Sequence, residues 1–83
     1  MLDLGFYKVI QKDNEFLTIR FMNLEYSHII CIAYDNNYDE FTLNSIWKII
    51  YSSANNMYIL KQNNIGTIFI YKPMKEYMEN IML

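Results

Sequence analysis

Residues 42–54 read TLNSIWKIIYSSA, and the interpretation of this stretch decides the fold class of the whole chain. Its apolar side chains recur at positions i, i+3, i+4, i+7 and i+11, which is typical of one stripe of an α-helix. The stripe consists of Leu43, Ile46, Trp47, Ile50 and Ala54. Thr42 suits the N-cap, and the asparagine pair at 55–56 suits the end of a helix. The spacing therefore predicts a helix over 42–54 that carries the single tryptophan into the core.

A β-hairpin is predicted upstream of this helix. The stretches 5–12 and 15–22 flank Asp13-Asn14, a pair that fits a two-residue turn. This turn would place Lys8 opposite Ile19 and Phe6 opposite Phe21, and opposed residues share a face. The predicted core face is Phe6, Ile10, Leu17, Ile19 and Phe21, and the other face is Tyr7, Val9, Phe16, Thr18 and Arg20.

Three further strands are predicted at 28–34, 57–62 and 66–72, the last two joined as a hairpin around residues 63–65. The strand at 28–34, HIICIAY, is apolar on both faces, as expected for an interior strand. In the second hairpin one face would hold Met57, Ile59, Ile68 and Ile70, and the other Tyr58, Leu60, Phe69 and Tyr71.

A short C-terminal helix is predicted after Pro73, which suits a first helical turn. Its apolar residues at helical spacing are Met74, Tyr77, Met78, Ile81 and Met82. The element order becomes three strands, a helix, two strands and a helix. We therefore expect one α+β domain over 1–83, with a mainly antiparallel five-stranded sheet and the 42–54 helix packed on one face.

Composition narrows the function classes. The formal net charge is −2, whereas nucleic-acid binders usually show a basic field. The single cysteine allows no intramolecular disulfide, and no apolar run approaches the roughly 20 residues of a membrane helix. We expect a cytoplasmic protein without a membrane segment.

More than half of the residues are Phe, Tyr, Met, Ile, Asn or Lys, which indicates an AT-rich genome.

The sequence offers no convincing catalytic or metal-binding set. His28 and Cys31, three residues apart on a strand, would point to opposite faces, so they would not form a dyad. Asp35, Asn37 and Asp39 resemble the start of a calcium loop, but Glu40 stands where that loop needs glycine. We predict a protein that is not an enzyme and that uses neither metal nor cofactor.

The apolar content of 53% is high for so small a chain, so a partner protein is expected to bury part of it. Tyrosine is enriched at interfaces, and acidic loops are accessible to partners. The predicted partner-binding residues are Asp35, Tyr38, Asp39, Glu40, Tyr58, Phe69 and Tyr71. The competing interpretation is that the C-terminal helix covers the three aromatic residues of the second hairpin.

The favoured hypothesis is a small protein-binding inhibitor of a host enzyme, encoded by a phage or mobile element, of the anti-defence or anti-CRISPR type. It would act in the cytoplasm of the host cell. This label rests on size and composition. One alternative is a homo-oligomeric structural or regulatory domain, for example a homodimer. The weaker alternative is a single-strand nucleic-acid binder that uses Tyr7, Phe16 and Arg20.

Overall fold

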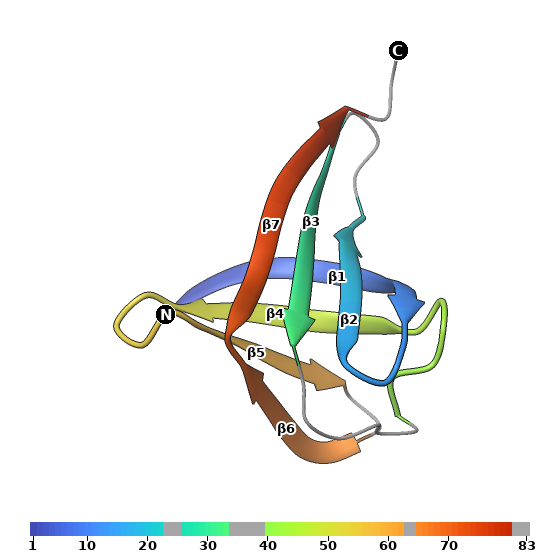
Figure 1. Cartoon of the computed structure of the whole chain (residues 1–83). Coiled ribbons are helices and arrows are strands. Elements are labelled where there is room, and N and C mark those ends of the chain that lie inside the picture. The colour runs from blue at the N-terminus through green and yellow to red at the C-terminus, as the bar shows by residue number, and fades with distance from the viewer. Residues whose placement is uncertain (23–25, 34–39, 63–64, 81–83) are drawn as a thin grey trace.

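The computed structural model describes residues 1–22, 26–33, 40–62 and 65–80, with side chains at 1–22, 28–33, 40–62 and 68–74. These ranges form one antiparallel sheet with the strand order β6-β5-β4-β1-β2-β3-β7 (Figure 1). The strands are β1 (Leu2–Lys12), β2 (Phe16–Phe21), β3 (Tyr26–Ala33), β4 (Ile46–Ser52), β5 (Met57–Gln62), β6 (Ile65–Tyr71) and β7 (Pro73–Asn80). The described part of the chain is all-β.

The stretch that the sequence assigned to a helix contains strand β4, so the prediction of a helix over 42–54 is wrong. β4 pairs with β1 on one side and with β5 on the other. Side chains alternate along it: Trp47 and Ile49 are fully buried, whereas Ile46 is 42% exposed. Apolar residues occupy both faces of β4, and this produced a helical spacing by coincidence. The α+β class is corrected to all-β.

The predicted C-terminal helix is also wrong, because residues 73–80 form strand β7. This strand pairs antiparallel with β3, and Ile29 lies opposite Tyr77. The stretch PMKEYMEN has few β-branched residues, so its intrinsic preference is helical. Backbone pairing along β3 overrides that preference, as tertiary context often does for short segments. The predicted five-stranded sheet therefore becomes seven-stranded over the described residues.

The first hairpin forms, but with a different register from the predicted one. Val9 lies opposite Ile19 and Tyr7 opposite Phe21, with a bulge between Val9 and Gln11. A shift of one residue moves every side chain to the other face of a strand. Tyr7 and Val9 consequently belong to the core, and Phe6 is exposed.

The second hairpin confirms the predicted faces. Ile59 lies opposite Ile70, and Leu60 lies opposite Phe69. Leu60 and Phe69 are buried, while Ile70 is exposed. The faces were predictable because strand alternation alone assigns them once the parity of the loop is known.

The sheet coils on itself, so that β2, β3 and β7 cross over β1 and β4 as a second layer (Figure 1). A bulge between Asp3 and Gly5 interrupts β1, and Gly5 has a φ of 95°, which glycine adopts without strain. The core between the layers consists of Tyr7, Val9, Leu17, Ile19, Ile30, Ile32, Phe41, Trp47, Ile49, Tyr58, Leu60 and Phe69.

Aromatic rings fill the end of this core next to β6. The ring centroids of Phe41 and Trp47 are 4.5 Å apart, and those of Phe41 and Phe69 are 4.7 Å apart. Such separations are typical of packed aromatic pairs. Phe41 thus anchors the segment that leads into β4 against strand β6.

The two edge strands of the sheet, β6 and β7, are consecutive in the chain, with Lys72 between them. The described side chains on the outer faces of β4, β5 and β6 are exposed or half-buried. No described element is a helix with the length and apolar character to cross a membrane.

Candidate functional site

A row of isoleucines crosses the outer face of β4, β5 and β6. Ile50 lies opposite Ile59, and Ile59 lies opposite Ile70, so the three side chains stand side by side. Ile68 and Ile70 are 54% and 53% exposed, and Ile50, Ile59 and Met57 are half-buried. We call this surface the isoleucine face, defined as Ile50, Met57, Ile59, Ile68 and Ile70.

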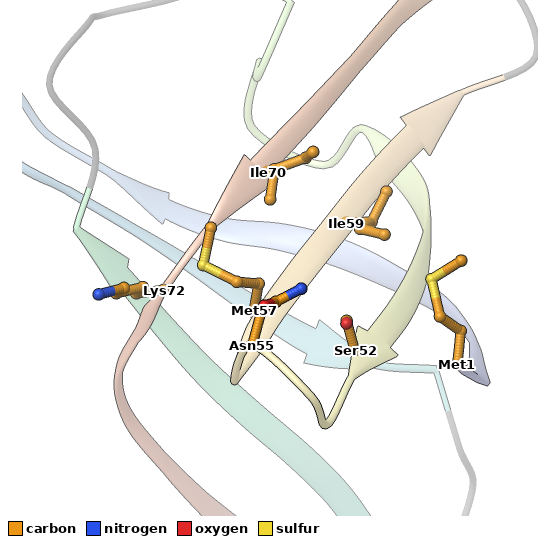
Figure 2. Close-up of a pocket in the computed structure, with 7 residues that line it drawn as sticks. All are labelled: Met1, Ser52, Asn55, Met57, Ile59, Ile70 and Lys72. Atoms are coloured by element: carbon orange, nitrogen blue, oxygen red, sulfur yellow. The ribbon is translucent and has the colours of Figure 1, made fainter.

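A groove of about 530 Å³ opens at one side of the isoleucine face. Figure 2 shows the lining residues, which come from the end of β4, the turn that follows it, β5, β6, the residue after β6 and the first residue of the chain. They are Met1, Ser52, Asn55, Met57, Ile59, Ile70 and Lys72. Ile59 and Ile70 lie next to each other, whereas the Lys72 ammonium extends away from the apolar side chains (Figure 2). The groove has an apolar floor with polar groups at its margin, as the core and rim of a protein interface do.

Lysines lie along the other margin of the isoleucine face. Lys48 on β4 is directly opposite Lys61 on β5, and like charges in that position repel each other. The Nζ atom of Lys48 lies 3.1 Å from Oδ2 of Asp3 and 4.7 Å from the ring centroid of Phe6. Strands β4, β5 and β6 contain no acidic residue at all. This surface therefore combines an apolar row with positive charge, although the chain as a whole is acidic.

Asp3 is held in its charged form at this margin. The amide of Gly5 donates a hydrogen bond of 2.9 Å to Oδ1 of Asp3. This bond, followed by the contact with Lys48 and the more distant charge of Lys61, lowers the pKa of Asp3 below its ordinary value of 3.8. One carboxylate thus faces two ammonium groups, and the margin keeps a positive balance.

The two edge strands differ in how they discourage pairing with other chains. β7 carries Pro73 and the charged residues Lys75, Glu76 and Glu79 in its sequence, which is typical of a protected edge. β6, with the sequence IGTIFIY, contains neither proline nor charge. A strand edge of this kind favours association with another molecule.

Four of the seven predicted partner-binding residues lie in the described part of the chain, and they occupy three different environments. Tyr58 and Phe69 are only 3% and 6% exposed and belong to the core. Tyr71 lies opposite Tyr58 and packs against the same core, half-buried. Glu40 is exposed at the start of the segment leading to β4. The remaining three, Asp35, Tyr38 and Asp39, lie outside the described residues.

The aromatic trio of the second hairpin is therefore brought together, but on the inner face of the sheet. The isoleucine face was missed as a candidate site, although Met57, Ile59, Ile68 and Ile70 were predicted to share one face. Both faces of this hairpin are apolar in the sequence, so no signal distinguished the exposed face from the buried one. The sequence predicted a helix over one face of the sheet and a partner surface on the aromatic face of this hairpin, so the isoleucine face was not among the predicted sites.

The residues that the sequence offered for catalysis or nucleic-acid binding are packed within the sheet and do not form an accessible site. Tyr7 is buried, and its hydroxyl lies 2.7 Å from Nδ1 of His28, so its ring is not on the outer surface of the first hairpin. Phe16 and Arg20 are half-buried on β2. Within the ranges that the structure covers, no group of three or more His, Cys, Asp or Glu residues is arranged to hold a metal ion.

Comparisons with protein-family models, curated proteins and solved structures find no match to this chain.

Proposed function

We propose that this chain is a non-enzymatic protein-binding protein and that it docks its partner on the isoleucine face. The observation that carries the proposal is the row of Ile50, Ile59 and Ile70, in register across three strands, with Ile70 exposed and the other two half-buried on the outside of the sheet. Monomeric proteins rarely expose contiguous apolar patches larger than a few hundred Å², and the largest apolar patch of a protein is often functional. Aliphatic side chains held on a sheet also lose little entropy when they are covered.

The finer proposal is an inhibitor of a host enzyme, encoded by a phage or mobile element and acting in the host cytoplasm. The small size and the AT-rich residue usage support this origin. An inhibitor of this kind needs a rigid surface and no catalytic groups, and a coiled sheet with an aromatic core supplies such a surface.

A homodimer is the second candidate function, and strand β6 favours it. The uncharged edge of β6 can pair with the same strand of a second copy, which would extend the sheet across both molecules. Light scattering at tens of micromolar discriminates between the two: a dimeric mass supports the homodimer, and a monomeric mass removes it.

Site-specific photo-crosslinking tests the docking proposal. p-Benzoylphenylalanine is introduced in place of the exposed Ile70 and, as a matched control, in place of the exposed Gln11 on β1. Both proteins are expressed in the native host and irradiated. We expect a discrete product of higher mass from position 70 and none from position 11, and we expect Ile59→Ser to abolish it. Equal products from both positions, or none from position 70, would refute the proposal.

A further inference from the structure

We infer that the partner element on the isoleucine face is an acidic amphipathic helix, lying along the isoleucine row with carboxylates on both of its flanks. This inference rests on the proposed function and adds the chemistry of the partner. A sheet face with exposed isoleucines is normally covered by another layer of secondary structure, and a helix packed on the face of a sheet is a common solution.

The charges around the row favour a partner that carries carboxylates. Lys48 and Lys61 stand opposite each other, and the carboxylate of Asp3 contacts Lys48. Lys72 lies at the groove on the other side of the row. An acidic partner would relieve the repulsion within the lysine pair and would place opposite charges at both margins.

The spacing of the margins fits the width of a helix. On β5, Lys61, Ile59 and Met57 alternate onto the outer face, with Lys61 at one margin and Met57 beside Lys72 at the groove. Strand residues rise about 3.4 Å each, so the two margins are roughly 14 Å apart. An α-helix with its side chains is about 10–12 Å wide. Carboxylates on its two flanks would therefore come near the lysines while its apolar stripe covers the row.

Two other classes of partner fit this surface less well. A face that binds anionic lipid typically gathers about four to eight Lys or Arg residues. Among the side chains that the structure describes, the three lysines Lys48, Lys61 and Lys72 share the face with Asp3. Single-stranded nucleic acid is bound by stacking on several aromatic rings, whereas the row consists of isoleucines.

Fluorescence anisotropy with three labelled helical peptides tests the inference on the intact protein. Each peptide has the same leucine stripe, flanked by Glu in the first, Gln in the second and Lys in the third. We expect the Glu peptide to bind about tenfold or more tightly than the Gln peptide, with an affinity that falls as salt rises. We expect no measurable binding of the Lys peptide.

Charge-reversed variants supply the controls. Lys61→Glu/Lys72→Glu should reverse the preference, so that the Lys peptide binds and the Glu peptide does not. Lys12→Glu, at the far end of β1, should leave the preference unchanged. Circular dichroism and thermal melts establish that each variant is folded.

Equal affinity for the Glu and Gln peptides, no binding of the Glu peptide, or insensitivity to Lys61→Glu/Lys72→Glu would overturn the inference. None of these results would affect the proposed function if the crosslink at position 70 still formed. Loss of that crosslink would instead remove the proposed function itself, so the two failures are distinguishable.

Discussion

The hydroxyl of Tyr7 on β1 lies 2.7 Å from Nδ1 of His28 on β3, a hydrogen bond that reaches across the intervening strand β2. Tyr7 is buried, and its ring also packs 5.3 Å from the ring of Phe21. The bond therefore ties together two strands that share no backbone pairing, and it satisfies a polar group inside the core.

Tyr7→Phe should lower the free energy of unfolding by about 1 kcal/mol, because it removes the hydroxyl and keeps the packed ring. Urea unfolding followed by tryptophan fluorescence measures the change. Tyr51→Phe is a matched control, since the hydroxyl of Tyr51 bonds to Asn56 at an exposed site. A larger loss in the control than in Tyr7→Phe would contradict the role given to this bond.

Ile49→Ala should cost about 2–5 kcal/mol, because Ile49 is fully buried and its truncation leaves a cavity. Ile46→Ala, three residues away on the exposed side of β4, should cost less than about 1 kcal/mol. A helix over 42–54 would reverse this order, since Ile46 lies on the apolar stripe and Ile49 does not. Denaturant midpoints of the two variants decide between the strand and the helix.

Gly5→Ala should be clearly destabilising for two separable reasons. The φ of Gly5 is 95°, a conformation that alanine rarely adopts, and an added Cβ would approach Cε1 of Phe21 to 3.3 Å. Combining Gly5→Ala with Phe21→Leu relieves the contact and leaves the backbone strain. We expect a coupling between the two substitutions in a double-mutant cycle, and strict additivity would show that the contact is unimportant.

The carboxyl of Asp3 should titrate below pH 3.8, because the Gly5 amide and Lys48 favour its charged form. A pKa lowered by folding contributes stability at pH values above the ordinary pKa, and that contribution is lost as the pH falls through the folded value. A ¹³C-detected titration of the carboxyl gives the midpoint directly. Lys48→Met should raise it without fully restoring 3.8, since the bond from Gly5 remains. A midpoint above 3.8 in the original protein would contradict the geometry described here.

The sequence predicted most strands correctly where their pattern had only one interpretation. The faces of the second hairpin followed from alternation, and its described pairs agree. In the first hairpin the strands were recognised, and the predicted core face of β2, with Leu17, Ile19 and Phe21, is confirmed. The bulge between Val9 and Gln11 shifted the register and exchanged the faces of β1 alone. A bulge adds a residue without a clear signature in a sequence, so the opposite faces of such a strand are difficult to assign.

The two predicted helices failed for different physical reasons. In β4, isoleucines occupy the outer face as well as the core face, so the strand shows apolar spacings that also match a helix. In β7 the residues favour a helix locally, and only pairing with a strand far away in the sequence makes it extended. Because residues 46–52 form a strand of the sheet and not a helix on top of it, the isoleucine face is uncovered among the described residues.

Strand β7 completes the second layer by pairing with β3, although β4, β5 and β6 all lie between them in the chain. Closing so long a loop has a large entropic cost before any contact compensates for it. We therefore expect the docking of β7 onto β3 to be the slow step of folding. Until that step, the apolar strand HIICIA would present an unpaired edge to other nascent molecules, so the yield of native protein should depend on concentration during refolding.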